Sequence, residues 1–216
     1  MTRDEQVSIA IPTGALLNGA LSVLSAAGLA RLSPEEVGRQ LLIERDSVRV
    51  ILVRPADVPA YVDHGAADLG IVGKDILWET PGAHYELVDL RFGGCRLVLA
   101  VPDASALDGP ETWPPMMRVA TKYPRTASAW FETRGQAVEM VQLHGSVELA
   151  PQVGLVDGIV DLTATGRTLQ ENRLRIAEVL GSSTARLIAN QASLKTRSAA
   201  VQSVVSKLRE ASGNAG

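Results

Sequence analysis

The sequence predicts an α/β protein built as two lobes with a cleft between them. A short apolar segment, a polar turn and a helix-like segment recur along the chain, beginning with the apolar residues 7–11. This repetition is typical of parallel α/β construction, in which ligand-binding groups gather at the carboxyl ends of the strands. The pair Gly93-Gly94 stands between two strand-like runs, which predicts a crossover or hinge between the lobes.

The first lobe is predicted from apolar runs that end in turn residues. Strands are expected at residues 7–11, 48–53 and 69–72, and helices at 15–30 and 58–64. Polar or flexible residues follow each strand directly: Thr13 and Gly14 after the first, Arg54 after the second and Gly73 after the third. We therefore expect these four residues at the carboxyl ends of the strands, where a ligand would bind.

The second half of the chain continues the same alternation. Strands are expected at residues 87–90, 95–101, 119–120, 138–143, 159–162 and 185–189, with helices at 126–134 and 193–211, a short helix starting at 146 and a surface loop at 102–115. The order of elements predicts that lobe I comprises residues 1–92 and 181–216, and that lobe II comprises residues 93–180.

Composition limits the classes of function. Of the 216 residues, 46% are hydrophobic and 21% are charged, and the net charge is −3, so there is no global electrostatic basis for binding nucleic acid. The single cysteine, Cys95, excludes an internal disulfide framework and a multi-cysteine metal site. The first six residues are polar and no stretch approaches the ~20 apolar residues of a membrane span, so we expect a cytoplasmic protein without a membrane partner.

One stretch, residues 158–169, is predicted to form a phosphate-binding loop, here called the phosphate cradle. A buried strand runs into a turn of small and hydroxyl-bearing residues with one glycine and one cation: Thr163, Ala164, Thr165, Gly166, Arg167 and Thr168. Such a turn directs several backbone N–H groups at one phosphate, and a following helix adds the positive end of its dipole. Asp161, at the end of the strand, is expected to accept hydrogen bonds from sugar hydroxyls. The alternative is an ordinary connection in which a threonine caps the helix.

Several stretches together resemble one enzyme family. They are residues 54–62, 64–75, 119–124, 148–169 and 183–190, and the similarity runs in order from about residue 7 to residue 190. The chain resembles the catalytic subunit of ATP phosphoribosyltransferase, the first enzyme of histidine biosynthesis, and its length resembles the short form. The resemblance implies an α/β, periplasmic-binding-protein-like (type II) architecture with an interlobe cleft.

The resemblance also implies roles for particular residues. The run Asp161 to Thr168 would bind the ribose and 5′-phosphate of phosphoribosyl pyrophosphate, and Arg54 would be catalytic beside the substrate phosphates. Other residues of the cleft would be Thr13, Gly14, Gly73, Lys122 and Glu148. Mg²⁺ is expected as the cofactor, carried mainly by the substrate, so no protein residue is predicted to ligate a metal. The expected partners are ATP, phosphoribosyl pyrophosphate, a second catalytic subunit in a homodimer and, in a hetero-oligomer, a regulatory subunit similar to histidyl-tRNA synthetase.

The chain departs from the family pattern in two places. Thr13-Gly14-Ala15 stands where the family usually has Lys-Gly-Arg, so two cations that help to hold ATP and pyrophosphate are missing. Each charge-assisted contact to phosphate is typically worth ~1.5–3 kcal/mol, so compensation is expected from Arg31, Arg39 or Arg45 or from a partner. Val156 stands where a smaller residue is usual.

Three other functions fit parts of the sequence. Two α/β lobes across a hinge also describe solute-binding proteins, which perform no chemistry. The missing cations fit a non-catalytic subunit with a regulatory or assembly role. The phosphate cradle also fits a phosphoribosyltransferase that accepts a base other than that of ATP.

Overall fold

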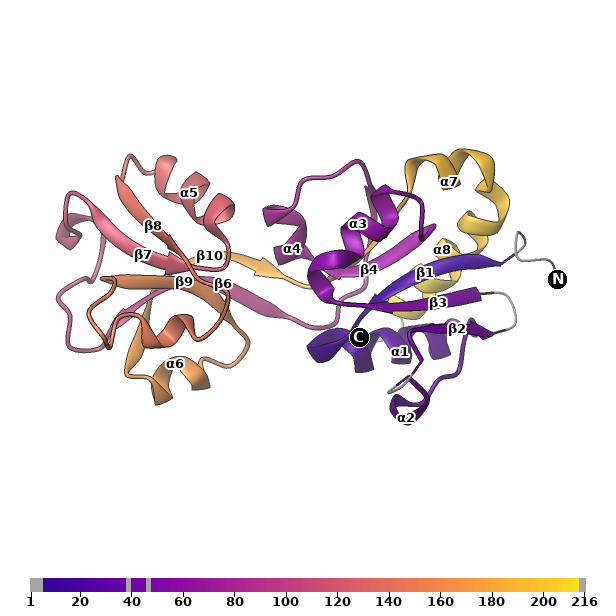
Figure 1. The fold of residues 1–216 in the computed structure, drawn as a ribbon, viewed down its shortest axis with the longest axis horizontal. Coiled ribbons are helices and arrows are strands. Elements are labelled where there is room, and N and C mark those ends of the chain that lie inside the picture. Colours follow the sequence, from indigo (N-terminus) through magenta and orange to yellow (C-terminus); the bar gives the residue numbers. More distant parts are fainter. Residues whose placement is uncertain (1–5, 38–39, 46–47, 214–216) are drawn as a thin grey trace. The chain divides into compact units, whose positions relative to one another are not determined.

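The chain folds into two compact units. A computed structural model describes residues 6–37, 40–45 and 48–213 (Figure 1). Unit 1 comprises Met1–Gly93 and Thr184–Gly216, and unit 2 comprises Gly94–Ser183. Gly93 therefore belongs to unit 1, although the sequence placed it in lobe II. Residues 181–183 belong to unit 2, although the sequence placed them in lobe I. The reason at the second boundary is that strand β10 (Leu174–Ser183) continues through Ser183.

Unit 1 contains a six-stranded mixed sheet. Its order is β2-β3-β1-β4-β11-β5, with β1 at Val7–Pro12, β2 at Leu42–Arg45, β3 at Val48–Val53, β4 at Leu69–Gly73, β5 at Tyr85–Asp89 and β11 at Ala185–Ala189. The central strand β1 runs parallel to both β3 and β4. All six residues of β1 are buried, as expected of a strand covered on both faces. The sequence predicted every strand of this sheet except the edge strand β2.

Helices cover both faces of the unit 1 sheet. Ile9 and Ile11 belong to a core cluster that contains α1 (Leu17–Ala26) and α8 (Ser198–Gly213) residues, whereas Ala10 packs with α3 (Val58–Asp63). This division follows from the alternation of side chains along β1. The remaining helical segments of the unit are η1 (Gly14–Leu16), α2 (Pro34–Val37), η2 (Pro55–Asp57), α4 (Lys74–Glu79) and α7 (Gln191–Thr196).

A buried carboxylate explains why the predicted helix at 193–211 is two helices. Helix α7 ends and α8 begins on either side of Arg197, whose guanidinium donates to Asp68 at 2.6 Å and to the Gln6 carbonyl at 2.8 Å. Asp68 also accepts bonds from the Ser8 N–H, the Ser8 hydroxyl and the Ser193 hydroxyl, each at 2.7 Å. The break in the helix thus allows one cation to reach the carboxylate that joins β1, β4 and α7.

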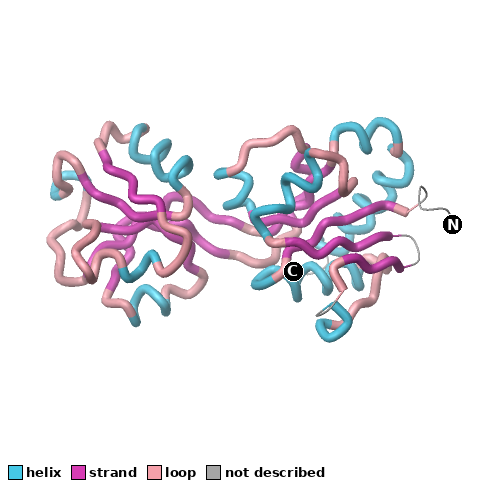
Figure 2. The backbone as a smooth tube through the Cα atoms, viewed as in Figure 1, coloured by secondary structure: helices cyan, strands magenta, loops and turns pink. Residues whose placement is uncertain are grey.

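Unit 2 contains a five-stranded mixed sheet (Figure 2). Its order is β10-β6-β9-β7-β8, with β6 at Cys95–Pro102, β7 at Met117–Thr121, β8 at Val138–Gln142 and β9 at Gly158–Thr163. Strand β7 is parallel to β8 and β9, whereas β6 is antiparallel to β9 and β10. The helical segments are η3 (Pro110–Thr112), α5 (Pro124–Glu132), η4 (Val147–Leu149) and α6 (Arg167–Glu171).

Strand β10 was not predicted from the sequence. It lies at an edge of the sheet, its register against β6 shifts twice, and most of its residues are only half-buried. These irregularities blur the alternation of apolar and polar residues on which recognition of a strand depends. Among the described residues, no helix is both long and apolar enough to cross a membrane.

Candidate functional site

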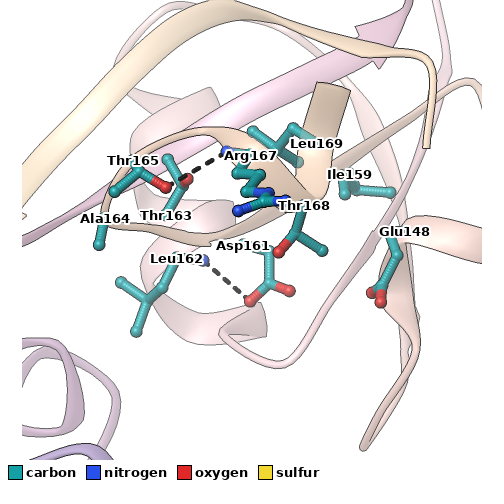
Figure 3. A pocket seen from close by; sticks show the side chains of 10 residues that line it. All are labelled: Glu148, Ile159, Asp161, Leu162, Thr163, Ala164, Thr165, Arg167, Thr168 and Leu169. Atoms are coloured by element: carbon teal, nitrogen blue, oxygen red, sulfur yellow. Dashed lines mark hydrogen bonds between the residues drawn. The ribbon is translucent and has the colours of Figure 1, made fainter. Parts of the chain in front are cut away.

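A cavity in unit 2 lies over the stretch that the sequence singled out. Its volume is about 180 Å³. Figure 3 shows the ten residues that line it: Glu148, Ile159, Asp161, Leu162, Thr163, Ala164, Thr165, Arg167, Thr168 and Leu169. Nine of these ten residues belong to one continuous stretch of chain, and Glu148 comes from the separate segment η4. The cavity is therefore formed mainly by the end of β9, the loop after it and α6.

The loop after β9 is held in shape by its own threonine and glycine. The buried hydroxyl of Thr163 accepts the Gly166 N–H at 2.8 Å, and the hydroxyl of Thr165 accepts the Arg167 N–H at a longer 3.4 Å. Gly166 has a φ of +83°, in the left-handed region that favours glycine. The sequence thus supplies a glycine where the turn requires this backbone conformation.

Other polar groups of the loop are available to a ligand. Among the described residues, no protein acceptor is found for the backbone N–H groups of Ala164, Thr165 and Thr168. Three backbone donors beside a cavity fit an anion such as phosphate. The predicted contribution of a helix dipole is small, because α6 has only five residues.

Asp161 is a half-buried carboxylate of the cavity, with a side chain 19% exposed. Its Oδ1 accepts the Leu162 N–H at 2.8 Å. Burial is the main reason that the pKa of Asp161 lies above its ordinary value of 3.8, and the negative charge of Glu148 adds to this. The Leu162 N–H and the positive charge of Lys122 lower the pKa without cancelling the rise.

Lys122 lies beside this carboxylate because of the sheet register. Thr121 of β7 pairs with Val160 of the parallel strand β9, so the next residues, Lys122 and Asp161, emerge side by side. The Nζ of Lys122 is 3.9 Å from Oδ2 of Asp161. The structure therefore brings Lys122, Glu148 and the Asp161 to Thr168 run together in unit 2.

Arg167 lines the cavity but is largely exposed. Its side chain is 82% exposed, and its Nε donates to Glu171 one turn along α6 at 2.8 Å. An exposed pair of this kind contributes little to stability. The guanidinium can therefore turn toward an anion at small cost.

The other predicted site residues meet at the carboxyl edge of the unit 1 sheet. The Thr13 N–H donates to the Val53 carbonyl at 2.9 Å, so Thr13 and Gly14 lie next to Arg54. Gly73 ends the neighbouring strand β4. Arg54 is exposed, Gly14 has a φ of +79°, and a Cβ on the buried Gly73 would lie 2.3 Å from Asp75 Oδ1.

The suggested compensation for the missing cations is not found within the described part of unit 1. Arg45 pairs with Val48 at the amino end of β3, roughly 20 Å along the strand from Arg54. Arg31 follows the far end of α1, roughly 15 Å of helix away from the Thr13 edge. Strand and helix directions thus place both cations at the wrong end, and Arg39 lies outside the described residues.

One side chain beside Lys122 was not identified from the sequence as part of the site. The hydroxyl of Thr121 bonds to the Val160 carbonyl of β9. This contact joins segments that are far apart in the chain, so no local signal marked Thr121.

Two further features lie in the same unit. Val156, the predicted departure from the family pattern, is buried in the same core cluster as Ile159, which lines the cavity. At the amino ends of the paired strands β7 and β9, the Arg118 guanidinium bonds to Asp157 at 2.9 Å and to the Leu155 carbonyl at 3.1 Å.

Comparison with known proteins identifies the family. The family model described as ATP phosphoribosyltransferase (HisG) matches residues 54–210. The chain belongs to the ATP phosphoribosyltransferase family. The ATP phosphoribosyltransferase of Caldanaerobacter subterraneus subsp. tengcongensis is 46% identical over 206 residues, covering 94% of this chain and 96% of that protein. That of Rubrobacter xylanophilus is 49% identical over 202 residues, covering 93% and 94% respectively.

Solved structures agree with ATP phosphoribosyltransferase family membership. A chain of the ATP phosphoribosyl transferase (HisG:HisZ) complex from Thermotoga maritima superposes with a TM-score of 0.81 at 34% identity, covering 97% of this chain and 100% of that one. The alkanesulfonate-binding protein SsuA from Xanthomonas axonopodis pv. citri gives 0.60 at 14% identity, covering 98% and 74%. The second likeness concerns the fold alone and confirms the predicted periplasmic-binding-protein-like architecture.

Proposed function

We propose that this chain is an ATP phosphoribosyltransferase that condenses ATP with phosphoribosyl pyrophosphate to give N1-(5-phosphoribosyl)-ATP and pyrophosphate. This is the first step of histidine biosynthesis. The observation that carries the proposal is the cavity formed by the Asp161 to Thr168 run in a chain of this family. Backbone donors, hydroxyls and two carboxylates around a space of about 180 Å³ suit a sugar phosphate.

The reaction needs positioning and charge neutralisation rather than a protein nucleophile. Adenine N1 forms a bond to ribose C1 as the bond from C1 to the pyrophosphate oxygen breaks, and the bonding electrons leave with pyrophosphate. The N–H groups and hydroxyls from Ala164 to Thr168 would hold the 5′-phosphate, and Asp161 would accept hydrogen bonds from ribose hydroxyls. Lys122 and Arg54 would offset negative charge on the phosphates, which is the main way in which such sites lower a barrier.

Mg²⁺ is proposed as a substrate-borne cofactor. Two carboxylates, Asp161 and Glu148, line the cavity, so its donor set tolerates a cation that enters with pyrophosphate. When bound, the ion would neutralise charge on the pyrophosphate oxygens. The described residues contain no group of three or more potential metal ligands, and we assign the ion no protein ligand.

Pyrophosphate release tests the activity directly. The chain is incubated with ATP, phosphoribosyl pyrophosphate and Mg²⁺, both alone and with a HisZ-type regulatory subunit. We expect pyrophosphate and an adenine product substituted at N1 in at least one condition. Absence of pyrophosphate in both would exclude the enzyme and favour a non-catalytic subunit, and release with a different base would indicate another phosphoribosyltransferase.

Replacing Thr165 by valine together with Gly166 by alanine is expected to weaken binding of phosphoribosyl pyrophosphate by about tenfold or more. The double change removes one hydroxyl and strains the turn that aims the backbone donors. Isothermal titration calorimetry measures the affinity, and thermal unfolding measures stability.

A matched control is available in the same unit. Gly135 has a φ of +67°, and a Cβ added to it, like one added to Gly166, would meet no atom within 4 Å. Thr133 is an exposed threonine outside the cavity. Thr133→Val with Gly135→Ala should cost a similar amount of stability and leave the affinity unchanged. If the two double variants bound phosphoribosyl pyrophosphate with equal affinity, the loop from Thr163 to Thr168 would not be part of the binding site.

The proposed partner is a HisZ-type regulatory subunit in a hetero-oligomer, supported by the Thermotoga maritima complex that this chain resembles. We further propose a homodimer of catalytic subunits and a cytoplasmic location. Light scattering after size-exclusion chromatography is expected to show a complex heavier than either component when the two subunits are mixed. Two unchanged peaks would contradict this assembly.

A further inference from the structure

Thr121 makes two hydrogen bonds at the point where β7 ends. Its side chain is fully buried. The hydroxyl donates to the Val160 carbonyl of β9 at 2.7 Å and accepts the Tyr123 N–H at 2.9 Å. The Thr121 hydroxyl thus links strand β9 to the backbone of Tyr123.

These two bonds involve the residues on either side of Lys122 and the residue that precedes Asp161. Lys122 lies between Thr121 and Tyr123, and Val160 directly precedes Asp161. The backbone positions from which the ammonium and the carboxylate project are therefore set relative to each other by the pairing of β7 with β9 and, at the end of that pairing, by the Thr121 hydroxyl.

We propose that Thr121 is a positioning residue, which holds Lys122 beside the Asp161 carboxylate so that the lysine can meet a phosphate of the bound substrate. This inference rests on the proposed function. A lysine has a long flexible stem, and the Lys122 side chain is 39% exposed with its Nζ 3.9 Å from Asp161 Oδ2. At such a separation the direct ion pair is weak, so the position of the lysine depends on how firmly its backbone is held.

The position of Lys122 matters because of the charges around Asp161. The charged groups around Asp161 are Lys122 from the end of β7, Glu148 from η4 and Arg167 from the start of α6. Arg167 is largely exposed, and Glu148 is negative. Lys122 is the cation whose charge lowers the pKa of Asp161, so its displacement would leave the two carboxylates less well compensated toward an incoming polyanion.

A merely structural role predicts a different pattern of effects. A buried hydrogen bond at the end of a strand stabilises the fold whichever residue lies next to it. If this were its only role, loss of the Thr121 hydroxyl would lower the stability of the fold, and the effect would not depend on the presence of Lys122. The two roles are separated by combining Thr121→Val, which has the same shape without a hydroxyl, with Lys122→Met. Thr121→Ser retains the hydroxyl, and Thr133→Val removes a hydroxyl that donates to the Trp130 carbonyl away from the cavity.

The first measurement is the Kd of phosphoribosyl pyrophosphate. We expect Thr121→Val to raise it by about fivefold, and Thr121→Ser and Thr133→Val to leave it within about twofold of the parent. In the Lys122→Met background, Thr121→Val should cause no further change. An equal increase in both backgrounds, or no increase in either, would overturn the positioning role.

The second measurement does not depend on substrate. Carboxyl-carbon NMR follows the pKa of Asp161, which the charge of Lys122 lowers. Thr121→Val should raise this pKa in the same direction as Lys122→Met, and should not raise it further when Lys122 is already methionine. An unchanged pKa of Asp161 in Thr121→Val would overturn the proposal. This result can be obtained even if the protein binds no phosphoribosyl pyrophosphate, so failure of this proposal and failure of the proposed function can be told apart.

Discussion

Replacing Asp161 by asparagine is expected to lower kcat/KM by about 10- to 100-fold while raising the melting temperature at pH 7. A hydrogen bond from a ribose hydroxyl to a carboxylate is typically worth ~1.5–3 kcal/mol, and most of this would be lost with a neutral amide. Asparagine still offers an oxygen to the Leu162 N–H, which donates to Asp161 at 2.8 Å. The loop should therefore keep its shape.

The expected gain in stability follows from the direction of the pKa shift. Because the pKa of Asp161 is raised in the folded protein, chiefly by burial, the native state favours the neutral acid. This contribution to the free energy of unfolding is fully present below pH 3.8 and is lost as the pH rises through the higher folded value. The Asn variant should thus match the parent near pH 3 and exceed it increasingly toward pH 7.

Asp157 provides a control of opposite sign in the same unit. Burial acts to raise its pKa, but hydrogen bonds from the Arg118 side chain and backbone, with the charge of Arg118, bring the pKa below 3.8. Asp157→Asn should therefore lower the melting temperature at pH 7. A loss of stability in Asp161→Asn, or unchanged kcat/KM, would contradict the role assigned to Asp161.

Replacing Asp68 by alanine is expected to reduce the free energy of unfolding of unit 1 by about 3 kcal/mol. Removing one partner of a buried, hydrogen-bonded ion pair typically costs ~3–5 kcal/mol because the other charge is left behind, and Arg197 is partly exposed, which favours the lower end. The two hydroxyls and the N–H that now donate to Asp68 would also lose their acceptor. Urea denaturation followed by circular dichroism measures the change.

The pH dependence at Asp68 has the opposite sign to that at Asp161. Burial acts to raise the pKa of Asp68, but bonds from Ser8 and Ser193 and the charge of Arg197 bring it below 3.8. This contribution to stability is present above pH 3.8 and is lost as the pH falls through the lower folded value. The difference between parent and variant should therefore shrink in acid.

An exposed ion pair serves as the comparison for Asp68. Asp108 bonds to Arg175 at 2.7 Å, but its side chain is 73% exposed. Asp108→Ala should cost less than about 1 kcal/mol. If Asp68→Ala cost no more than Asp108→Ala, the buried network would not be a main support of unit 1.

The fold was predictable wherever apolar runs were regular. The strands that begin at Val7, Val48 and Leu69 are mostly buried, so their sequences are predominantly apolar and bounded by turn residues. The edge strand β10 was missed because one side of it faces solvent and its register is interrupted. The break at Arg197 was missed because its cause is a carboxylate 129 residues away in sequence.

The candidate site divides in the same way. The turn from Thr163 to Thr168 was predictable, because a glycine among small hydroxyl residues after a buried strand is a local pattern. The proximity of Lys122 and Glu148 to Asp161 was implied only by family resemblance, and its physical basis is the pairing of β7 with β9. The hydroxyl of Thr121 gave no local signal at all.

The sequence by itself determined the α/β class, the main strands, the family and the loop that ends β9. Each of these can be recognised from residues close together in the chain, by the period of the apolar pattern, the residue types of the turns and the spacing of motifs. Only the tertiary structure decided that Asp161 is half-buried, that Thr121 bonds to the neighbouring strand beside Lys122, and that Arg31 and Arg45 lie at the wrong edge to replace the missing cations. Burial, register and strand direction depend on segments far apart in the chain, so no local pattern encodes them.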